Sequence, residues 1–291
     1  MFERLSRSWD LGKSSWRLLR ANPTLMAFPA IAAIAMLISS VIIGGIGFSI
    51  LAATTGIDDI SISTDNAPGF VVVALILFAA SLITIYFNTA LTAVVMRQID
   101  GQPATLADGL AVAKSRLRPI LGWAVVSTTV GLVLSILRDK AGWAGSLISF
   151  IGEMAWGLAT FFVIPVLAAH NIGPIDAIRE SAALFKRTWG EQVIGQAGIG
   201  LFSLVLSLPF VFLGLLFIGI GVASGNIVIL VLMIVLAVLA FGAVAALVST
   251  LGSIYRSVLY RWATNGDVAQ GFDSDTITSA FGPKPNRRIM I

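Results

Sequence analysis

Long apolar stretches alternate along this chain with shorter segments that mix polar, charged and apolar residues. The apolar stretches are Leu25–Ala53, Phe70–Val95, Pro119–Leu137, Leu147–Ala169, Val193–Val222 and Ile227–Ile254. A helix needs about 20 predominantly apolar residues to cross the hydrocarbon layer of a bilayer, which is roughly 30 Å thick. The pattern therefore predicts an all-α polytopic membrane protein with six transmembrane helices.

Three of the shorter segments space their apolar residues by three and four, which places them on one face of a helix. These positions are Phe2, Leu5, Trp9, Gly12, Trp16 and Leu19, then Leu106, Leu110, Ala113 and Leu117, then Ile175, Ile178, Ala182, Phe185 and Trp189. Basic residues accompany them at Arg4, Arg7, Lys13, Arg17 and Arg20, at Lys114, Arg116 and Arg118, and at Arg179, Lys186 and Arg187. We interpret the segments as amphipathic helices in the headgroup layer, with these basic residues as candidate lipid-headgroup contacts. The alternative is that each helix packs on its own bundle in the cytosol.

The amphipathic segments divide one membrane domain, residues 1–263, into three similar parts. Residues 1–101, 102–173 and 174–263 each read as an amphipathic helix followed by a transmembrane hairpin. Thr105 with Asp108 predicts a capping box, and Pro174 suits the first turn of a helix. Residues 264–291 are rich in glycine, proline and polar residues, which predicts a flexible tail. An extended arm that docks on a neighbouring subunit is the alternative for this tail.

The charged residues are few and unevenly distributed. The chain is 57% hydrophobic and 12% charged, about half the charge of a soluble domain. Of its 19 lysines and arginines, all but Arg138 and Lys140 lie before the first predicted membrane helix, after the sixth, or in the second and fourth connections. By the positive-inside rule, both termini and all three amphipathic helices are predicted to be cytoplasmic. Because the basic residues lie next to membrane helices, anionic lipid is the expected partner and nucleic acid is not.

No arrangement of residues typical of catalysis is found along the chain. There is no cysteine and a single histidine, His170, so thiolate and multi-histidine metal sites are not expected. Phosphate-binding glycine loops and nucleophile-elbow motifs are also missing from the sequence. We therefore predict no catalytic residues, no cofactor and no metal, and a protein that is not an enzyme.

A few polar residues fall inside apolar stretches and form a candidate intramembrane polar site, namely Glu153, Asn88 and Gln196. An ionisable residue at membrane depth is a functional candidate because its burial is costly. Glu153 is only a turn or two from the outer end of its helix, so an ion pair with Arg138 or Lys140 is the alternative. Hydrogen bonding between helices is the alternative for the other two.

Several motifs resemble those of an uncharacterised family of six-helix prokaryotic membrane proteins. The resembling segments are Phe2-Glu3-Arg4-Leu5-Ser6-Arg7-Ser8-Trp9, Phe161-Phe162-Val163-Ile164-Pro165-Val166, and Gly173-Pro174-Ile175-Asp176-Ala177-Ile178 through Phe185-Lys186-Arg187-Thr188-Trp189-Gly190. The chain is more distantly similar to the membrane domain that accompanies some glycerophosphodiester phosphodiesterases. The soluble catalytic domain of those enzymes is absent from this sequence, so the resemblance does not imply their activity.

The sequence leaves three functions open. The leading hypothesis is a non-enzymatic, multi-pass protein of the prokaryotic inner membrane that forms homo-oligomers and binds lipids, preferentially anionic ones. A channel or transporter for a small or amphiphilic solute is the alternative, based on Glu153 and the polar residues of the second and fifth helices. A lipid-processing enzyme is the third hypothesis. Whether the protein has a soluble partner is left open by the sequence.

Overall fold

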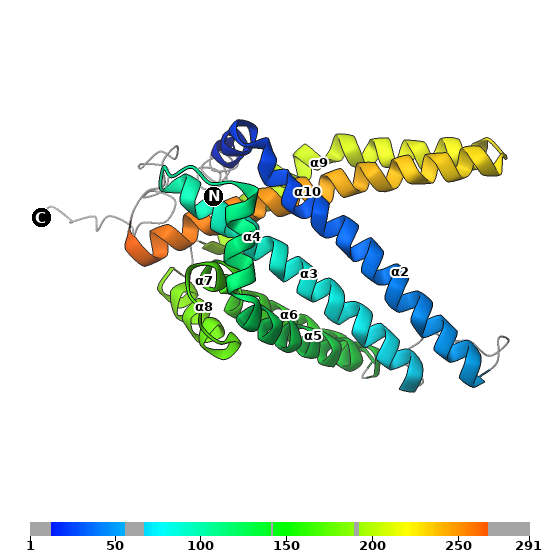
Figure 1. The fold of residues 1–291 in the computed structure, drawn as a ribbon, viewed down its shortest axis with the longest axis horizontal. Coiled ribbons are helices and arrows are strands. Elements are labelled where there is room, and N and C mark those ends of the chain that lie inside the picture. Colours follow the sequence, from blue (N-terminus) through cyan, green and yellow to red (C-terminus); the bar gives the residue numbers. More distant parts are fainter. Residues whose placement is uncertain (1–12, 56–66, 141, 189–191, 267–291) are drawn as a thin grey trace, which may run out of the picture. The chain divides into compact units, whose positions relative to one another are not determined.

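A computed structural model describes residues 13–55, 67–140, 142–188 and 192–266 (Figure 1). These residues are helical apart from short connections, and they contain no strand. The first described helix comprises residues 13–21. The elements that follow are η1 Pro23–Met26, α2 Ala27–Thr55, α3 Ala67–Ile99, α4 Leu106–Ser115, α5 Leu117–Lys140, α6 Gly142–Ala159, α7 Val163–Ala169, α8 Pro174–Thr188, α9 Gln192–Ala223 and α10 Ile227–Asn265.

Six segments in this part of the chain are long and apolar enough to cross a membrane, as the sequence predicts. They are Pro23–Ile50, Gly69–Ile99, Leu117–Arg138, Gly145–Ala169, Ser203–Ala223 and Ile227–Asn265. Many of their large side chains have no protein neighbour to bury them: Val41 on α2 is 73% exposed and Phe150 on α6 is 62% exposed. Apolar surface of this extent is unusual on a soluble monomer and fits contact with lipid.

The chain forms two compact units. The first, here called the hairpin unit, comprises Met1–Pro23, Met96–Pro103 and Leu184–Ile291, and its described part includes α9 and α10. The second, the bundle unit, comprises Thr24–Val95 and Ala104–Ala183, with α2, most of α3, and α4 to α7. The helix α8 begins in the bundle unit and ends in the hairpin unit.

In the hairpin unit, α9 and α10 run side by side from a short turn at residues 224–226 (Figure 1). Asn226 caps α10, because its Oδ1 accepts hydrogen bonds from the N–H groups of Val228 and Ile229. Close packing occurs at Gly214, where an added Cβ would lie 2.8 Å from the ring of Phe241. The helix α9 continues through Pro209 without interruption.

The bundle unit holds α4 against the membrane helices. The predicted capping box is confirmed: Asp108 N–H donates to Thr105 Oγ1, and the Asp108 carboxylate accepts from Thr105 N–H. One turn further on, Tyr86 on α3 donates a hydrogen bond to the carbonyl of Leu110 at 3.4 Å. The segment that the sequence assigned to the headgroup layer thus makes direct contact with α3.

Gly109 allows this contact. A Cβ at this position would lie 2.6 Å from the backbone oxygen of Ala90, 2.7 Å from Val94 and 2.9 Å from Phe28. The first of these is backbone on α3, which cannot rotate away as a flexible side chain does. Glycine is therefore required where α4 crosses α3, a feature that apolar periodicity does not reveal.

The fourth predicted membrane helix is not continuous. It is divided into α6 and α7 by a turn at residues 160–162, where the apolar stretch Leu147–Ala169 predicts one uninterrupted helix. In the structure Pro165 is the third residue of α7, and the first four N–H groups of any helix have no acceptor within it. Its missing N–H therefore interrupts no hydrogen bond of α7.

We expect Gly109→Ala to lower the free energy of unfolding by about 1–3 kcal/mol, the usual cost of overpacking. The measurement is thermal unfolding in detergent, followed by circular dichroism. Gly131→Ala on α5 is the matched control, because nothing lies within 4 Å of an added Cβ there. Equal midpoints for Gly109→Ala and the native chain would show that α4 does not pack on α3 as described.

Candidate functional site

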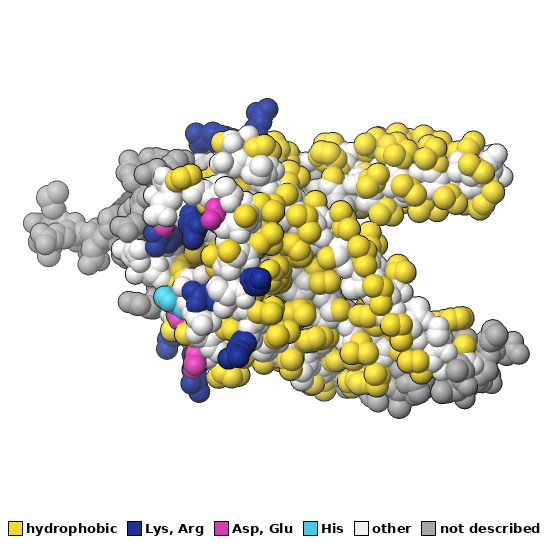
Figure 2. Space-filling view, viewed as in Figure 1, with side chains coloured by type: hydrophobic (Ala, Val, Ile, Leu, Met, Phe, Trp, Pro, Cys, Tyr) yellow, Lys and Arg dark blue, Asp and Glu magenta, His cyan; other side chains and the backbone are white. Residues whose placement is uncertain are grey.

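Basic side chains gather at one end of the bundle unit, where α4 ends, α5 begins, and α7 and α8 meet. We call this group the basic end; it consists of Lys114, Arg116, Arg118, His170 and Arg179. All except Arg116 are exposed. In Figure 2 dark-blue side chains of this unit lie around α4, α7 and α8, whereas hydrophobic side chains cover much of the membrane helices.

Arg116 connects the elements of the basic end. It is the C-cap of α4, and its Nη2 lies 3.5 Å from the carbonyl oxygen of Ala169, the last residue of α7. A guanidinium is favourable there because the final carbonyls of a helix lack intrahelical partners and carry partial negative charge. The Nε of Arg116 is buried and has no partner among the described residues.

The helix α8 is anchored at this end by two contacts. An added Cβ on Gly122 of α5 would lie 3.1 Å from the ring of Pro174, so α5 and the start of α8 approach closely. Further along α8, Ser181 is fully buried and its Oγ accepts a hydrogen bond from Phe162 N–H at 2.9 Å. Phe162 lies in the turn between α6 and α7, where its N–H is not part of the helical hydrogen-bond pattern. The bond to Ser181 satisfies this N–H.

The remaining charges at the basic end are partly balanced. Arg179 Nη1 lies 3.3 Å from Asp176 Oδ1 on the first turn of α8, and His170 Nε2 lies 3.6 Å from Glu180 Oε1. Both pairs are largely exposed, so each contributes little to stability. Lys114 and Arg118 have no carboxylate within salt-bridge distance in the described part of the chain. Positive charge therefore remains available to an anionic ligand.

The other basic residues proposed from the sequence belong to the hairpin unit. Lys13, Arg17, Arg20 and Lys186 are exposed, and Arg17 donates to the hydroxyl of Ser14 at 3.0 Å. Arg4 and Arg7 lie outside the described residues, as does the side chain of Arg187.

Glu153 forms an ion pair with Arg138, which joins α6 to the end of α5. The glutamate side chain is 45% exposed and the arginine side chain 53%. Nearby, Ser149 donates to the carbonyl of Leu134 at 3.0 Å, so the two helices are hydrogen-bonded as well as packed. The ion pair that the sequence offers as the alternative for Glu153 is therefore present.

The three candidates for an intramembrane polar site are not brought together by any described contact. Asn88 is half-buried on α3, two residues before the point where Ala90 meets α4. Glu153 pairs with the far end of α5, whose 24 residues span about 36 Å at 1.5 Å per residue. Gln196 lies in the first turns of α9, and its side chain is outside the part of the chain that the structure describes.

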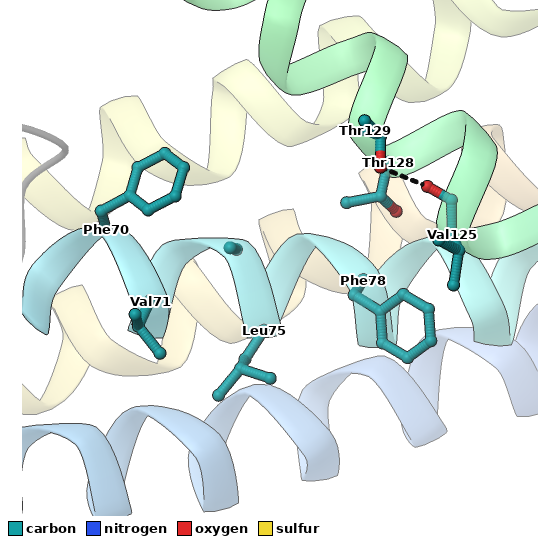
Figure 3. A pocket seen from close by; sticks show the side chains of 8 residues that line it. Phe70, Val71, Leu75, Phe78, Val125, Thr128 and Thr129 are labelled. Carbon is teal, nitrogen blue, oxygen red and sulfur yellow. Dashed lines mark hydrogen bonds between the residues drawn. The ribbon is translucent and has the colours of Figure 1, made fainter. Parts of the chain in front are cut away.

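A groove between α3 and α5 has a volume of about 280 Å³ (Figure 3). It is lined by Phe70, Val71, Ala74, Leu75, Phe78, Val125, Thr128 and Thr129. The hydroxyl of Thr129 donates to the carbonyl of Val125 at 2.8 Å, within its own helix. The groove is thus almost wholly apolar and offers no group for acid–base chemistry.

Within the described ranges, no group of three or more histidine, aspartate or glutamate side chains is placed to hold a metal ion. The basic end is therefore the best candidate for a site in this part of the chain. Sequence patterning identified its lysine and its three arginines, but neither His170 nor Ser181, which bonds to the N–H of Phe162 in a turn more than a dozen positions earlier.

One comparison with known proteins identifies the family. The model of a family of unknown function, DUF6159, matches residues 67–272, which is more than half of the chain. The chain belongs to this family. Neither the curated proteins nor the solved structures that were searched gave a match. The matched range includes α3 to α10, and with them the whole basic end.

We expect Glu153→Gln to lower stability in a bilayer by about 1 kcal/mol, because Arg138 then lacks its partner at membrane depth. Arg138→Gln should have a similar effect. The double variant should be less destabilised than the sum of the two, which a double-mutant cycle of thermal midpoints in nanodiscs measures. Strict additivity would show that the two side chains do not interact.

Proposed function

We propose that this protein is a non-enzymatic integral membrane protein that binds anionic lipids through its basic amphipathic helices and assembles as a homo-oligomer. The observation that carries the proposal is the basic end, where exposed lysine and arginine side chains lie next to segments of membrane-spanning length in the bundle unit. Basic residues next to membrane helices attract anionic headgroups with about 1 kcal/mol each.

The placement of α8 supports this reading. Ala177 and Ser181 are fully buried, while Arg179 and Lys186 are exposed, so one face packs and another carries positive charge. Ile175 at the start of α8 is 51% exposed and is apolar. A helix with these properties is suited to the boundary between headgroups and acyl chains.

We place the protein in the inner membrane of a prokaryote, with both termini in the cytoplasm. The supporting observation is the charge distribution, in which all but two of the 19 lysines and arginines fall on one side of the proposed membrane helices. In this arrangement the helices form three hairpins, each preceded by an amphipathic helix on the cytoplasmic side. The apolar surfaces of α9 and α10 are then available to acyl chains and to a second copy of the chain.

The proposal predicts preferential retention of anionic lipid. Native mass spectrometry of the protein, extracted from mixed phosphatidylglycerol and phosphatidylcholine, should show more phosphatidylglycerol bound than its share of the mixture. A triple variant, Lys114→Gln with Arg118→Gln and Arg179→Gln, should lose most of this preference, by about fivefold per residue.

The matched control is the charge-conserving triple Lys114→Arg, Arg118→Lys and Arg179→Lys, which should keep the preference. Lipid retention by the neutral triple equal to that of the native chain would contradict lipid binding at the basic end. The same spectra report the number of copies per particle, and monomers alone in mild detergent would contradict the homo-oligomer.

A further inference from the structure

Arg256 lies at an unusual position along α10. It is 256 − 227 = 29 residues beyond Ile227, the first residue of this helix, which is about 44 Å at 1.5 Å per residue. The hydrocarbon layer is roughly 30 Å thick, and the headgroup regions bring the total to about 40–45 Å. A helix that enters the membrane at Ile227 therefore places Arg256 among the headgroups of the opposite leaflet.

The side chain of Arg256 turns back toward the membrane rather than away from it. Its Nε donates to the carbonyl oxygen of Gly252, one turn earlier, at 3.1 Å. The guanidinium lies against Gly252, where an added Cβ would be 3.5 Å from Nη2, an ordinary van der Waals contact. A long basic side chain near a membrane ordinarily extends toward water, so this direction requires a compensating interaction.

The two arginines in this part of α10 differ in their partners. Arg261 is neutralised by Asp100, whose Oδ1 accepts a hydrogen bond from Arg261 Nε at 3.0 Å. Arg256 is partly buried, and no carboxylate of the described residues lies within salt-bridge distance of it. The nearby hydroxyl of Ser257 is already used, because it donates to the carbonyl of Ser253 at 2.8 Å.

A partly buried guanidinium without a countercharge is costly, and a phosphate is the anion that its planar array of donors fits best. At the depth of Arg256 the abundant phosphates are those of lipid headgroups. We propose that Arg256 binds the phosphate group of an anionic lipid, in the leaflet opposite the turn between α9 and α10. This inference rests on the proposed lipid-binding function, but it assigns one tight site to the hairpin unit, separate from the basic end.

The test is a native mass spectrometry titration of the full chain with phosphatidylglycerol. We expect one lipid to bind more tightly than the rest, and Arg256→Gln to weaken that binding by about tenfold, since a hydrogen bond to a charged group is lost. Arg256→Lys keeps the charge without the two-pronged geometry and should lose less. Arg97→Gln, at an exposed arginine of the same unit that is not among the candidate headgroup contacts, is the control and should leave the tight lipid in place.

Each other outcome has a defined meaning. Unchanged tight binding in Arg256→Gln, together with a normal thermal midpoint, overturns this site, while the proposed function stands if the neutral triple variant at the basic end still loses its preference. A different ligand would be indicated if inorganic phosphate displaces the tight lipid, and if phosphate stabilises the native chain but does not stabilise Arg256→Gln. That result overturns the lipid assignment in favour of a soluble phosphate compound. If Arg256→Gln fails to fold, binding of the tight lipid that is weaker in Arg256→Lys than in the native chain supports the site, and binding equal to the native chain overturns it.

Discussion

A bilayer core offers no hydrogen-bond partner to a backbone N–H or C=O group, and this constraint explains most of what the structure does with its helices. Long uninterrupted helices such as α9 and α10 satisfy their own backbone. Where a helix is interrupted, another part of the chain has to supply the partner. The turn between α6 and α7 illustrates this, because Phe162 is fully buried and its N–H finds Ser181 of α8. The first part of α8 is thus a structural part of the bundle unit as well as a carrier of charge.

The same reasoning applies to charge. A basic group close to apolar surroundings needs a neighbouring group that neutralises its charge, and the basic residues of this chain differ in that neighbour. Arg138 meets Glu153, Arg261 meets Asp100, and Arg116 approaches the end of α7. Arg256 and the exposed residues of the basic end lack such partners in the described part of the chain, and for them an anion from outside the protein is the simplest neutralising group.

The sequence predicted the features that depend on nearest neighbours along the chain. Apolar stretches predicted the six membrane-spanning segments, and Thr105 with Asp108 predicted the N-terminal cap of α4. Both features follow from local spacing. It did not predict contacts between distant segments. Gly109 is required by the backbone of Ala90, and nothing around Gly109 in the sequence signals this.

The candidate site was predictable to a similar extent. The basic residues were predicted, because lysine and arginine that lie between regularly spaced apolar positions can be recognised from the sequence alone. The partners that distinguish Arg261 from Arg256 were not, because Asp100 lies on a connection some 160 residues away from Arg261. A charge can be located from sequence, whereas its neutralisation depends on the fold.

The central claim is that α4 and α8 lie on the cytoplasmic side of a membrane that α9 and α10 cross. Since the chain has no cysteine, single cysteines can be introduced and labelled in intact cells with a membrane-impermeant maleimide. The exposed residues Ala111 on α4, Ala183 on α8 and Ile227 at the start of α10 are suitable positions. The account predicts labelling of Ile227→Cys in intact cells, and labelling of Ala111→Cys and Ala183→Cys only after the cells are opened. Labelling of either alanine variant in intact cells, or protection of Ile227→Cys, would contradict it.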